Sequence, residues 1–243
     1  MSNIAVIFAG GVGSRMNAKS RPKQFLELNG KPILIYTLEL FDNHSLIDGI
    51  VVVCLEPWIP FLKKMLRKFE VSKVLSVIPG GASSQESIYR GLCETETIVK
   101  SKNDSECIVL IHDGVRPLIT EDTITDNINT VKKCGSCITI VPAIETVVVK
   151  DRNEKLVIPK RSDSMLARAP QSFYLHDIIS AHRRAQKEGL SSFIDSCSLM
   201  NYYGYDLGLV EGPMENIKIT TPTDFFVLRA MVEVHENQQI FGF

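Results

Sequence analysis

The residues best suited to chemistry in the first part of the chain are a glycine-rich loop and the basic side chains that follow it. The loop has three glycines within four positions, Gly10, Gly11 and Gly13. Glycine lets the backbone approach another group closely, so the N–H groups of the loop can point at phosphate oxygens. Arg15 and Lys23 add positive charge nearby in the sequence. This combination indicates a binding site for a nucleoside triphosphate.

Two well-known phosphate-binding patterns do not account for this loop. The Walker pattern is absent because no Gly-Lys-Ser/Thr follows the glycines. Gly11 and Gly13 fit the dinucleotide pattern, but Met16 stands where that pattern needs its third glycine. The acidic residue expected about 20 positions later is also missing from a clean second strand. An NAD-dependent oxidoreductase stays open as an alternative enzyme class, and so does a purely structural turn between a strand and a helix.

A second glycine turn, Gly80-Gly81, leads into a predicted helix. Ser83 followed by Glu86 three positions later is a capping box, which marks the first turn of a helix. The N-terminus of a helix favours anions and offers unpaired N–H donors. The segment therefore indicates a second part of an anion site, with an ordinary capped helix as the alternative.

Asp113 follows the apolar run 107–111, which is typical of a buried strand. In open α/β sheets, ligands lie beyond the carboxyl ends of the strands, so this carboxylate could hold Mg²⁺ against substrate phosphates. Alternatively, Asp113 pairs with Arg116 and fixes the loop between them. His112 has no second His or Cys at ligand spacing, which favours a packed or hydrogen-bonded residue over a metal ligand.

The composition limits the classes of partner. The 243 residues include 27 basic and 28 acidic side chains, for a net charge of −1, so we expect neither a nucleic-acid nor a membrane partner. No apolar stretch is long enough for a membrane span, and no signal segment is evident, so we expect a cytoplasmic protein. The six cysteines are too few for a disulfide scaffold. Cys134 and Cys137 form one isolated pair at a predicted helix end, Gly135, and are interpreted as ordinary thiols.

Apolar runs alternate with amphipathic stretches, as in a parallel sheet covered by helices. We predict a single α/β domain over 1–243, with a doubly wound, mainly parallel nucleotide-binding sheet and helices on both faces. The predicted strands are 4–8, 49–54, 74–78, 107–111, 137–141 and 207–210. The predicted helices include one begun by Lys31-Pro32, with proline at the first helical position, and others at 57–69, 175–188, 193–202 and from Pro222, which Thr221 caps.

The alternation is interrupted by an inserted β-hairpin. Residues 146–150 and 155–158 are rich in β-branched and other apolar side chains, and the polar segment 151–154 separates them. A two-stranded hairpin is marginally stable alone in water, so this arm, at about 143–161, should pack on another surface. A second subunit would supply that surface, which predicts a homodimer.

Several motifs in register along the chain resemble the cytidylyltransferases that make CDP-polyols from CTP and a polyol phosphate. Known members act on 2-C-methyl-D-erythritol 4-phosphate in isoprenoid synthesis or on ribitol 5-phosphate for teichoic acids and capsules. The resemblance extends from Ile4 to the helix after Pro222. The motifs begin at Ala9, Pro22, Gly80, His112, Ala169 and Val210, the last continuing to Asn216-Ile217-Lys218.

The resemblance also implies roles for individual residues. Arg15, Lys23 and Lys218 would act at the reacting phosphates, and Mg²⁺ would be bound at Asp113. The nucleotide would be held by Ala9, Gly10, Gly11, Gly13, Gly80, Gly81, Ser87 and Asp113. The polyol phosphate would be held by Asp195 together with Thr146 and Arg161, the latter two from the arm of the neighbouring subunit, which completes the active site.

One departure from the family pattern concerns the nucleotide side of the site. The family usually has arginine at the position of Ser84. The runs 158–161 and 216–224 look closer to the ribitol phosphate enzymes than to those acting on methylerythritol phosphate. We therefore expect ribitol 5-phosphate as substrate, with methylerythritol phosphate as the alternative. A non-catalytic nucleotide sensor is a further alternative, against which the basic residues and Asp113 argue.

Overall fold

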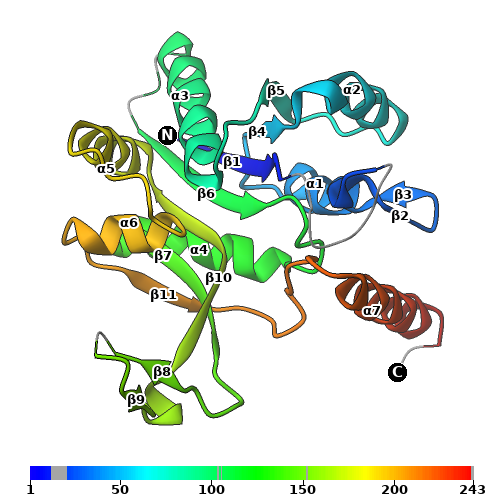
Figure 1. Cartoon of the computed structure of the whole chain (residues 1–243). Helices are drawn as coiled ribbons and strands as arrows, with labels where there is room; N and C mark the ends of the chain where they lie inside the picture. The colour runs from blue at the N-terminus through cyan, green and yellow to red at the C-terminus, as the bar shows by residue number, and fades with distance from the viewer. Residues whose placement is uncertain (12–20, 103, 105, 152, 242–243) are drawn as a thin grey trace.

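The computed structural model describes residues 1–11, 21–102, 104, 106–151 and 153–241, with side chains in the last helix as far as residue 234. Its central sheet has seven strands, in the spatial order β11-β7-β10-β6-β1-β4-β5 (Figure 1). These strands are β1 (Ser2–Ala9), β4 (Gly49–Cys54), β5 (Val74–Pro79), β6 (Cys107–Asp113), β7 (Ser136–Pro142), β10 (Met165–Tyr174) and β11 (Gly208–Glu211). All neighbouring strands are parallel except that β10 runs antiparallel to both β6 and β7. The predicted mainly parallel α/β sheet is confirmed.

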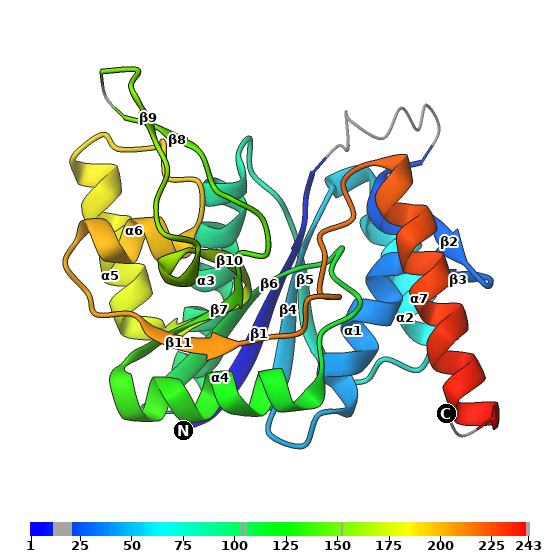
Figure 2. The same ribbon diagram turned by 90° about the horizontal axis from the view of Figure 1, so that it is seen from below.

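Helices cover both faces of the sheet, as predicted for a doubly wound fold (Figure 2). One face packs against α1 (Ile33–Asn43), α2 (Ile59–Lys68) and α4 (Glu121–Cys134), and the other against α3 (Ser84–Ser101), α5 (Leu175–Lys187) and α6 (Ser196–Tyr202). Residues of β1 alternate between the two cores: Ala5 and Ile7 enter the first, and Ile4 and Val6 the second. Because both faces are buried, the strands have continuous apolar sequences.

Local capping signals in the sequence correctly marked several helix ends. The Ser83 hydroxyl accepts a hydrogen bond from the Glu86 N–H at 3.1 Å, at the start of α3. The Thr221 hydroxyl accepts one from the Asp224 N–H at 3.3 Å, at the start of α7 (Pro222–Phe241). Gly135 ends α4 in the left-handed region, with φ of 83°.

Two predicted helix starts were wrong. Lys31–Pro32 forms a short strand, β3, paired with β2 (Glu27–Leu28), and Pro32 is extended at the N-cap of α1 instead of being its first helical residue. The helix predicted over 193–202 begins only at Ser196, because the Asp195 carboxylate caps it by accepting the Ser198 N–H at 2.9 Å. An aspartate at the N-cap satisfies an otherwise unpaired donor.

No pattern in the sequence predicted β10, which lies between β7 and β6 inside the sheet. Its segment contains a charged residue and a proline and has no apolar run, which argues against a central strand. The polar groups of β10 can be buried because they form hydrogen bonds with segments that are distant in the sequence. The Ser172 hydroxyl donates to Asn127 Oδ1 at 2.9 Å, and the Thr139 hydroxyl donates to the Pro170 carbonyl at 2.8 Å.

The predicted hairpin arm is present and projects from the sheet (Figure 1). Its paired strands, β8 (Val149–Lys150) and β9 (Leu156–Val157), are shorter than predicted, so Thr146 lies outside the strands. The Asp151 carboxylate closes the turn by accepting the N–H groups of Asn153 and Lys155. Several apolar side chains of the arm and its base are exposed in this single chain: Ile144, Val148, Val149, Leu156, Val157, Ile158, Met165 and Leu166.

In the part of the chain that the structure describes, no helix combines the length and apolar character that crossing a membrane requires.

Candidate functional site

The order of the strands creates a site at their carboxyl ends. From β1 the chain moves outward to β4 and β5 and then returns to place β6 on the other side of β1. Connections therefore leave β1 and β6 in opposite directions, which opens a crevice where ligands bind in folds of this type. Phe8 near the end of β1 lies beside Asp113 at the end of β6. The glycine loop and the predicted acidic residue thus flank the same crevice.

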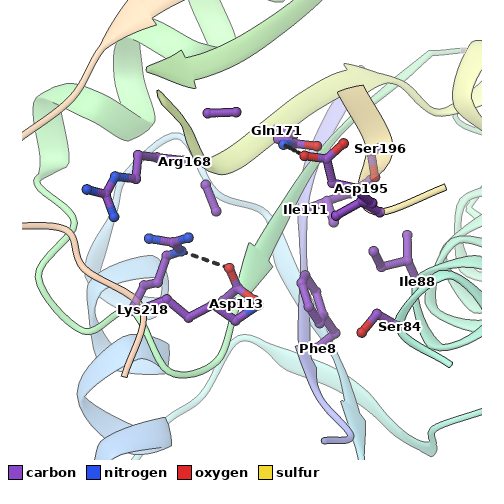
Figure 3. Close-up of a pocket in the computed structure, with 14 residues that line it drawn as sticks. Phe8, Ser84, Ile88, Ile111, Asp113, Arg168, Gln171, Asp195, Ser196 and Lys218 are labelled. Carbon is purple, nitrogen blue, oxygen red and sulfur yellow. Dashed lines mark hydrogen bonds and ion pairs between the residues drawn. The ribbon is translucent and has the colours of Figure 1, made fainter. Parts of the chain in front are cut away.

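Two adjoining cavities occupy this crevice. The first has a volume of about 220 Å³ and is lined by residues that include Asp113, Arg168, Gln171, Asp195 and Lys218 (Figure 3). The second has a volume of about 360 Å³ and is lined by residues that include Gly10, Gly11, Gly81, Ser83 and Ser87. Phe8 and Ser84 line both cavities, so the two spaces adjoin at these side chains.

The two glycine turns meet at the second cavity. The Ser87 hydroxyl accepts the Gly81 N–H at 3.0 Å and donates to the Ser83 carbonyl at 2.8 Å. A Cβ atom on Gly80 would lie 3.2 Å from the Ser87 oxygen, and one on Gly10 would lie 3.3 Å from it. Both distances are tighter than ordinary packing, so glycine at these positions keeps the turns close together. The structure places Gly10, Gly80, Gly81 and Ser87 together as predicted.

Gln24 holds the opening loop in place. It lies in a short 3-10 helix, Lys23–Phe25, and its side-chain amide donates to the Ala9 carbonyl at 2.6 Å and to the Gly11 carbonyl at 3.3 Å. This link ties the residue next to Lys23 to the end of β1 and to the start of the glycine loop. Gly13 and Arg15, both predicted site residues, lie outside the described residues.

Asp113 is the electrostatic centre of the first cavity. Its buried carboxylate accepts a hydrogen bond from Lys218 Nζ at 2.6 Å and another from Arg116 Nε at 2.8 Å. Burial alone would raise the pKa of this carboxyl, but the ammonium and guanidinium charges outweigh it and hold the pKa at about 2. Asp113 is therefore ionised throughout the neutral range. The pairing of Asp113 with Arg116, which the sequence left open as an alternative, is present, and Lys218 is a second partner.

A chain of hydrogen bonds brings Lys218 to this position from a segment distant in the sequence. The Arg116 guanidinium donates to the Asn216 carbonyl at 2.8 Å, and the Asn216 amide donates to the Ala169 carbonyl at 2.7 Å. The Ile219 N–H donates to the Val115 carbonyl at 3.0 Å. These bonds join the segment after β11 to the loop after β6 and to β10, so the Lys218 ammonium faces the cavity.

Asp195 and Gln171 form the far wall of the first cavity (Figure 3). The Gln171 amide donates to Asp195 Oδ2 at 3.3 Å, while its oxygen accepts the Cys197 N–H at 2.8 Å. Asp195 Oδ1 also accepts bonds from the Ser198 N–H and hydroxyl. Partial burial would raise the pKa of Asp195, but these donors lower it overall. Asp195 lines the cavity as predicted and presents a carboxylate whose orientation is fixed.

The other predicted residues lie outside both cavities. Thr146 and Arg161 are exposed on the arm, Arg161 in a short 3-10 helix (Arg161–Asp163). Neither lines the two cavities of its own chain. His112 is buried beside Phe41, and its Nε2 lies 3.1 Å from the Arg116 carbonyl. Burial lowers the pKa of His112 to about 4, which suits the packed residue that the sequence indicated.

Ser84, where the family usually has arginine, lies on the boundary between the two cavities. One guanidinium does reach the second glycine turn, because Arg90 donates to the Gly80 carbonyl at 2.8 Å. Arg90 also pairs with Glu86 at 2.6 Å.

Sequence reasoning missed Phe8 and Arg168. Phe8 lies between the cavities, and the Lys218 ammonium is 5.7 Å from the centre of its ring. Arg168 could have been recognised as a site residue because it directly precedes the Ala169-Pro170-Gln171 motif. Its position in the site, however, depends on strand β10, which was not predicted.

The donors around Asp113 limit the kind of metal site that is feasible. Both oxygens of Asp113, and both of Asp195, accept hydrogen bonds. Among the described residues, no group of three or more His, Cys, Asp or Glu side chains could hold a metal ion. Those residues therefore offer no metal site made by protein ligands alone, and a metal ion at Asp113 would need further ligands from the substrates.

Known proteins resemble this chain over almost its full length. A ribitol-5-phosphate cytidylyltransferase of Vibrio parahaemolyticus is 55% identical, over 99% of this chain and 100% of its own. A 2-C-methyl-D-erythritol 4-phosphate cytidylyltransferase of Clostridium botulinum is 37% identical, over 95% of this chain and 97% of its own. The crystal structure of 4-diphosphocytidyl-2C-methyl-D-erythritol synthase from Anaerococcus prevotii superposes with a TM-score of 0.80 at 26% identity, covering 96% of each chain.

The family assignment follows from a match over nearly the whole sequence. Residues 3–234 match the 2-C-methyl-D-erythritol 4-phosphate cytidylyltransferase family. That span contains every element of the sheet and both cavities. The chain belongs to this family of nucleotidyltransferases.

Proposed function

We propose that this protein joins CTP and ribitol 5-phosphate to give CDP-ribitol and pyrophosphate. The observation that carries the choice of substrate is the 55% identity, over essentially the whole length, to a protein named for that reaction. A polyol phosphate is also compatible with the chemistry of the first cavity, which combines cations with fixed hydrogen-bonding groups. The second candidate is 2-C-methyl-D-erythritol 4-phosphate, the substrate named for the matched family.

The two adjoining cavities suggest how the two substrates lie. CTP would occupy the glycine-lined cavity, where the turns at Gly10 and Gly81 allow close approach of phosphates. The polyol phosphate would occupy the cavity walled by Gln171 and Asp195. Phe8 and Ser84 then mark the junction where the reacting groups meet.

The reaction needs no covalent enzyme intermediate. An oxygen of the polyol phosphate attacks the α-phosphorus of CTP in line, a new P–O bond forms, and the bond to pyrophosphate breaks. Both reactants are anions, so catalysis requires positive charge at the junction and correct alignment. Lys218, Lys23 and Arg15 would supply that charge. Bound Mg²⁺, with Asp113 as its protein ligand, would add Lewis-acid stabilisation of phosphate charge.

A panel assay tests the proposed substrate. The enzyme would be given CTP and Mg²⁺ with ribitol 5-phosphate, 2-C-methyl-D-erythritol 4-phosphate and other straight-chain polyol phosphates, and pyrophosphate release would be followed. We expect the highest kcat/KM with ribitol 5-phosphate. A higher value with methylerythritol phosphate would favour the second candidate. Binding of CTP without turnover on any member would favour a nucleotide sensor.

The proposal includes a homodimer, which the exposed arm supports, and a cytoplasmic location, which is the expectation from the sequence. Its apolar side chains are uncovered in the single chain, and a partner subunit would bury them. Thr146 and Arg161 would then reach the polyol phosphate bound to the neighbouring chain. This arrangement gives a purpose to two residues that do not line the cavities of their own chain.

Replacing Arg161 tests the contribution of the arm. Because a hydrogen bond to a charged group contributes roughly 1.5–3 kcal/mol, Arg161→Ala should raise KM for ribitol 5-phosphate about 10- to 100-fold. KM for CTP should change less than about twofold, since the arm does not line the glycine cavity. Lys155→Ala, which removes an exposed charge from the same hairpin, is the matched control. Full activity of a protein that sediments as a monomer would refute the arm's role.

A further inference from the structure

Arg168 is a charged residue that lines the first cavity. It lies on β10 immediately before Ala169, and it lines the cavity together with Lys218 and Asp113 (Figure 3). The side chain is half-buried, and its Nε is buried without any hydrogen-bond partner in the described part of the chain. A buried donor left unsatisfied is costly, and a native protein usually keeps one for a reason.

None of the ion pairs among the described residues of this cavity includes Arg168. Arg116 and Lys218 share the carboxylate of Asp113. The other carboxylate, Asp195, is bound by Gln171 and by the first turn of α6. Across the described residues that line this cavity, three cations therefore face two anions. Arg168 is the cation that forms no ion pair.

The surroundings of Arg168 make its charge unfavourable in the substrate-free protein. Burial, followed by repulsion from the nearby Arg116 guanidinium, lowers the pKa of Arg168. An arginine that served only to cover apolar surface would place its guanidinium in water. Here the guanidinium is partly desolvated beside another cation, an arrangement that an incoming anion would stabilise.

The anions of the proposed reaction are phosphates, and guanidinium geometry suits them. Its planar fork can donate two parallel hydrogen bonds to a phosphate. Arg168 lines the cavity of Gln171 and Asp195, and it does not line the glycine-rich cavity. Its position therefore favours the phosphate of the polyol over the triphosphate of CTP.

We propose that Arg168 binds the phosphate group of the polyol phosphate within its own chain. This inference rests on the proposed function and deepens it. Arg168 on β10 would then contribute to the affinity for the polyol phosphate, in addition to the arm of the partner subunit. This role also makes Arg168 a specificity residue, because an unphosphorylated polyol would leave its charge unpaired.

The test compares Arg168→Met and Arg168→Lys with the wild type in steady-state assays. We expect Arg168→Met to raise KM for ribitol 5-phosphate about 10- to 100-fold, since it removes a charged donor from the phosphate. KM for CTP should change less than about twofold. KM for ribitol 5-phosphate in Arg168→Lys should lie between the values of the wild type and Arg168→Met, because lysine keeps the positive charge but lacks the planar guanidinium that donates two parallel hydrogen bonds.

A stability measurement separates binding from a structural role. Without substrates, Arg168→Met should melt at the same temperature as the wild type or higher, because it removes a desolvated charge that lacks a partner. With a non-hydrolysable CTP analogue present, ribitol 5-phosphate should raise the melting temperature of the wild type. The rise should be much smaller for Arg168→Met.

The outcomes distinguish this inference from the proposed function. If the wild type prefers another polyol phosphate in the panel assay, the proposed substrate is wrong, and the same variants are then tested with the preferred one. An unchanged KM for that compound in Arg168→Met would overturn the inference. A lower melting temperature with weaker dimerisation and an unchanged KM would show instead that Arg168 pairs across a subunit interface.

Discussion

Lys218→Ala should lower kcat about 100- to 1,000-fold, the usual loss when one preorganised group that stabilises transition-state charge is removed. The Lys218 ammonium is held at the cavity by Asp113 and is still partly exposed, with 39% of its side chain accessible, so it can reach a bound phosphate. Negative charge builds up on the oxygens around the α-phosphorus, at the junction of the two cavities, as the new P–O bond forms and the bond to pyrophosphate breaks. A cation fixed beforehand near that position stabilises the transition state more than the ground state.

The measurement is kcat at saturating CTP and ribitol 5-phosphate, corrected for the folded fraction. Lys218→Arg should retain part of the activity, because it keeps the charge and changes the geometry. Lys132→Ala, at an exposed lysine in the last turn of α4, is the matched control and should behave as the wild type. If Lys218 only neutralises Asp113, its alanine variant would be less stable and would keep a nearly normal kcat, which would remove it from the mechanism.

Asp113→Asn should cost about 3–5 kcal/mol of unfolding free energy, because it leaves the buried Arg116 guanidinium without its counterion. Arg116 is almost completely enclosed, with 10% of its side chain exposed, so water cannot replace the lost carboxylate. Lys218 is more exposed and would be resolvated. Urea denaturation at neutral pH measures the loss.

The double variant Asp113→Asn with Arg116→Met is the control for this interpretation. Removing both charges eliminates the uncompensated guanidinium, so the double variant should be more stable than Asp113→Asn alone. If the single and double variants lose the same stability, the ion pair is not the source of the effect.

The pH dependence of the unfolding free energy gives a second measurement of the Asp113 ion pairs. The pKa of Asp113 in the folded protein is about 2, below its ordinary value of 3.8. A carboxyl with a depressed folded pKa contributes stability that is complete above its unfolded pKa and is lost as pH falls toward the folded one. The wild type should therefore lose about 2 kcal/mol from this group between about pH 4 and pH 2. Asp113→Asn should lack that component, and an identical acid transition in both proteins would contradict the assignment.

Most of the secondary structure could be predicted from the sequence because its signals are local. Continuous apolar runs predicted the parallel strands, since a strand buried on both faces needs no polar alternation. Ser83, Thr221 and Gly135 marked helix ends because a cap depends on a few adjacent residues. The glycine turns and Asp113 could be assigned to one site because the carboxyl ends of parallel strands share one edge of the sheet.

Only the tertiary structure decided the features that depend on distant contacts. β10 has no apolar pattern, and it became a central strand because partners from α4 and β7, through Asn127 and Thr139, satisfy its polar groups. The cap that Asp195 forms on α6 is a local signal that the prediction overlooked, whereas its contact with Gln171 depends on the folded chain. Arg168 lies in the site because β10 pairs with β6, a pairing that the sequence did not predict. The sequence alone determined the elements and the chemical types of the site, because propensities and caps act over a few residues. The charge balance at Asp113 and Arg168 was decided by segments that meet only in the folded chain.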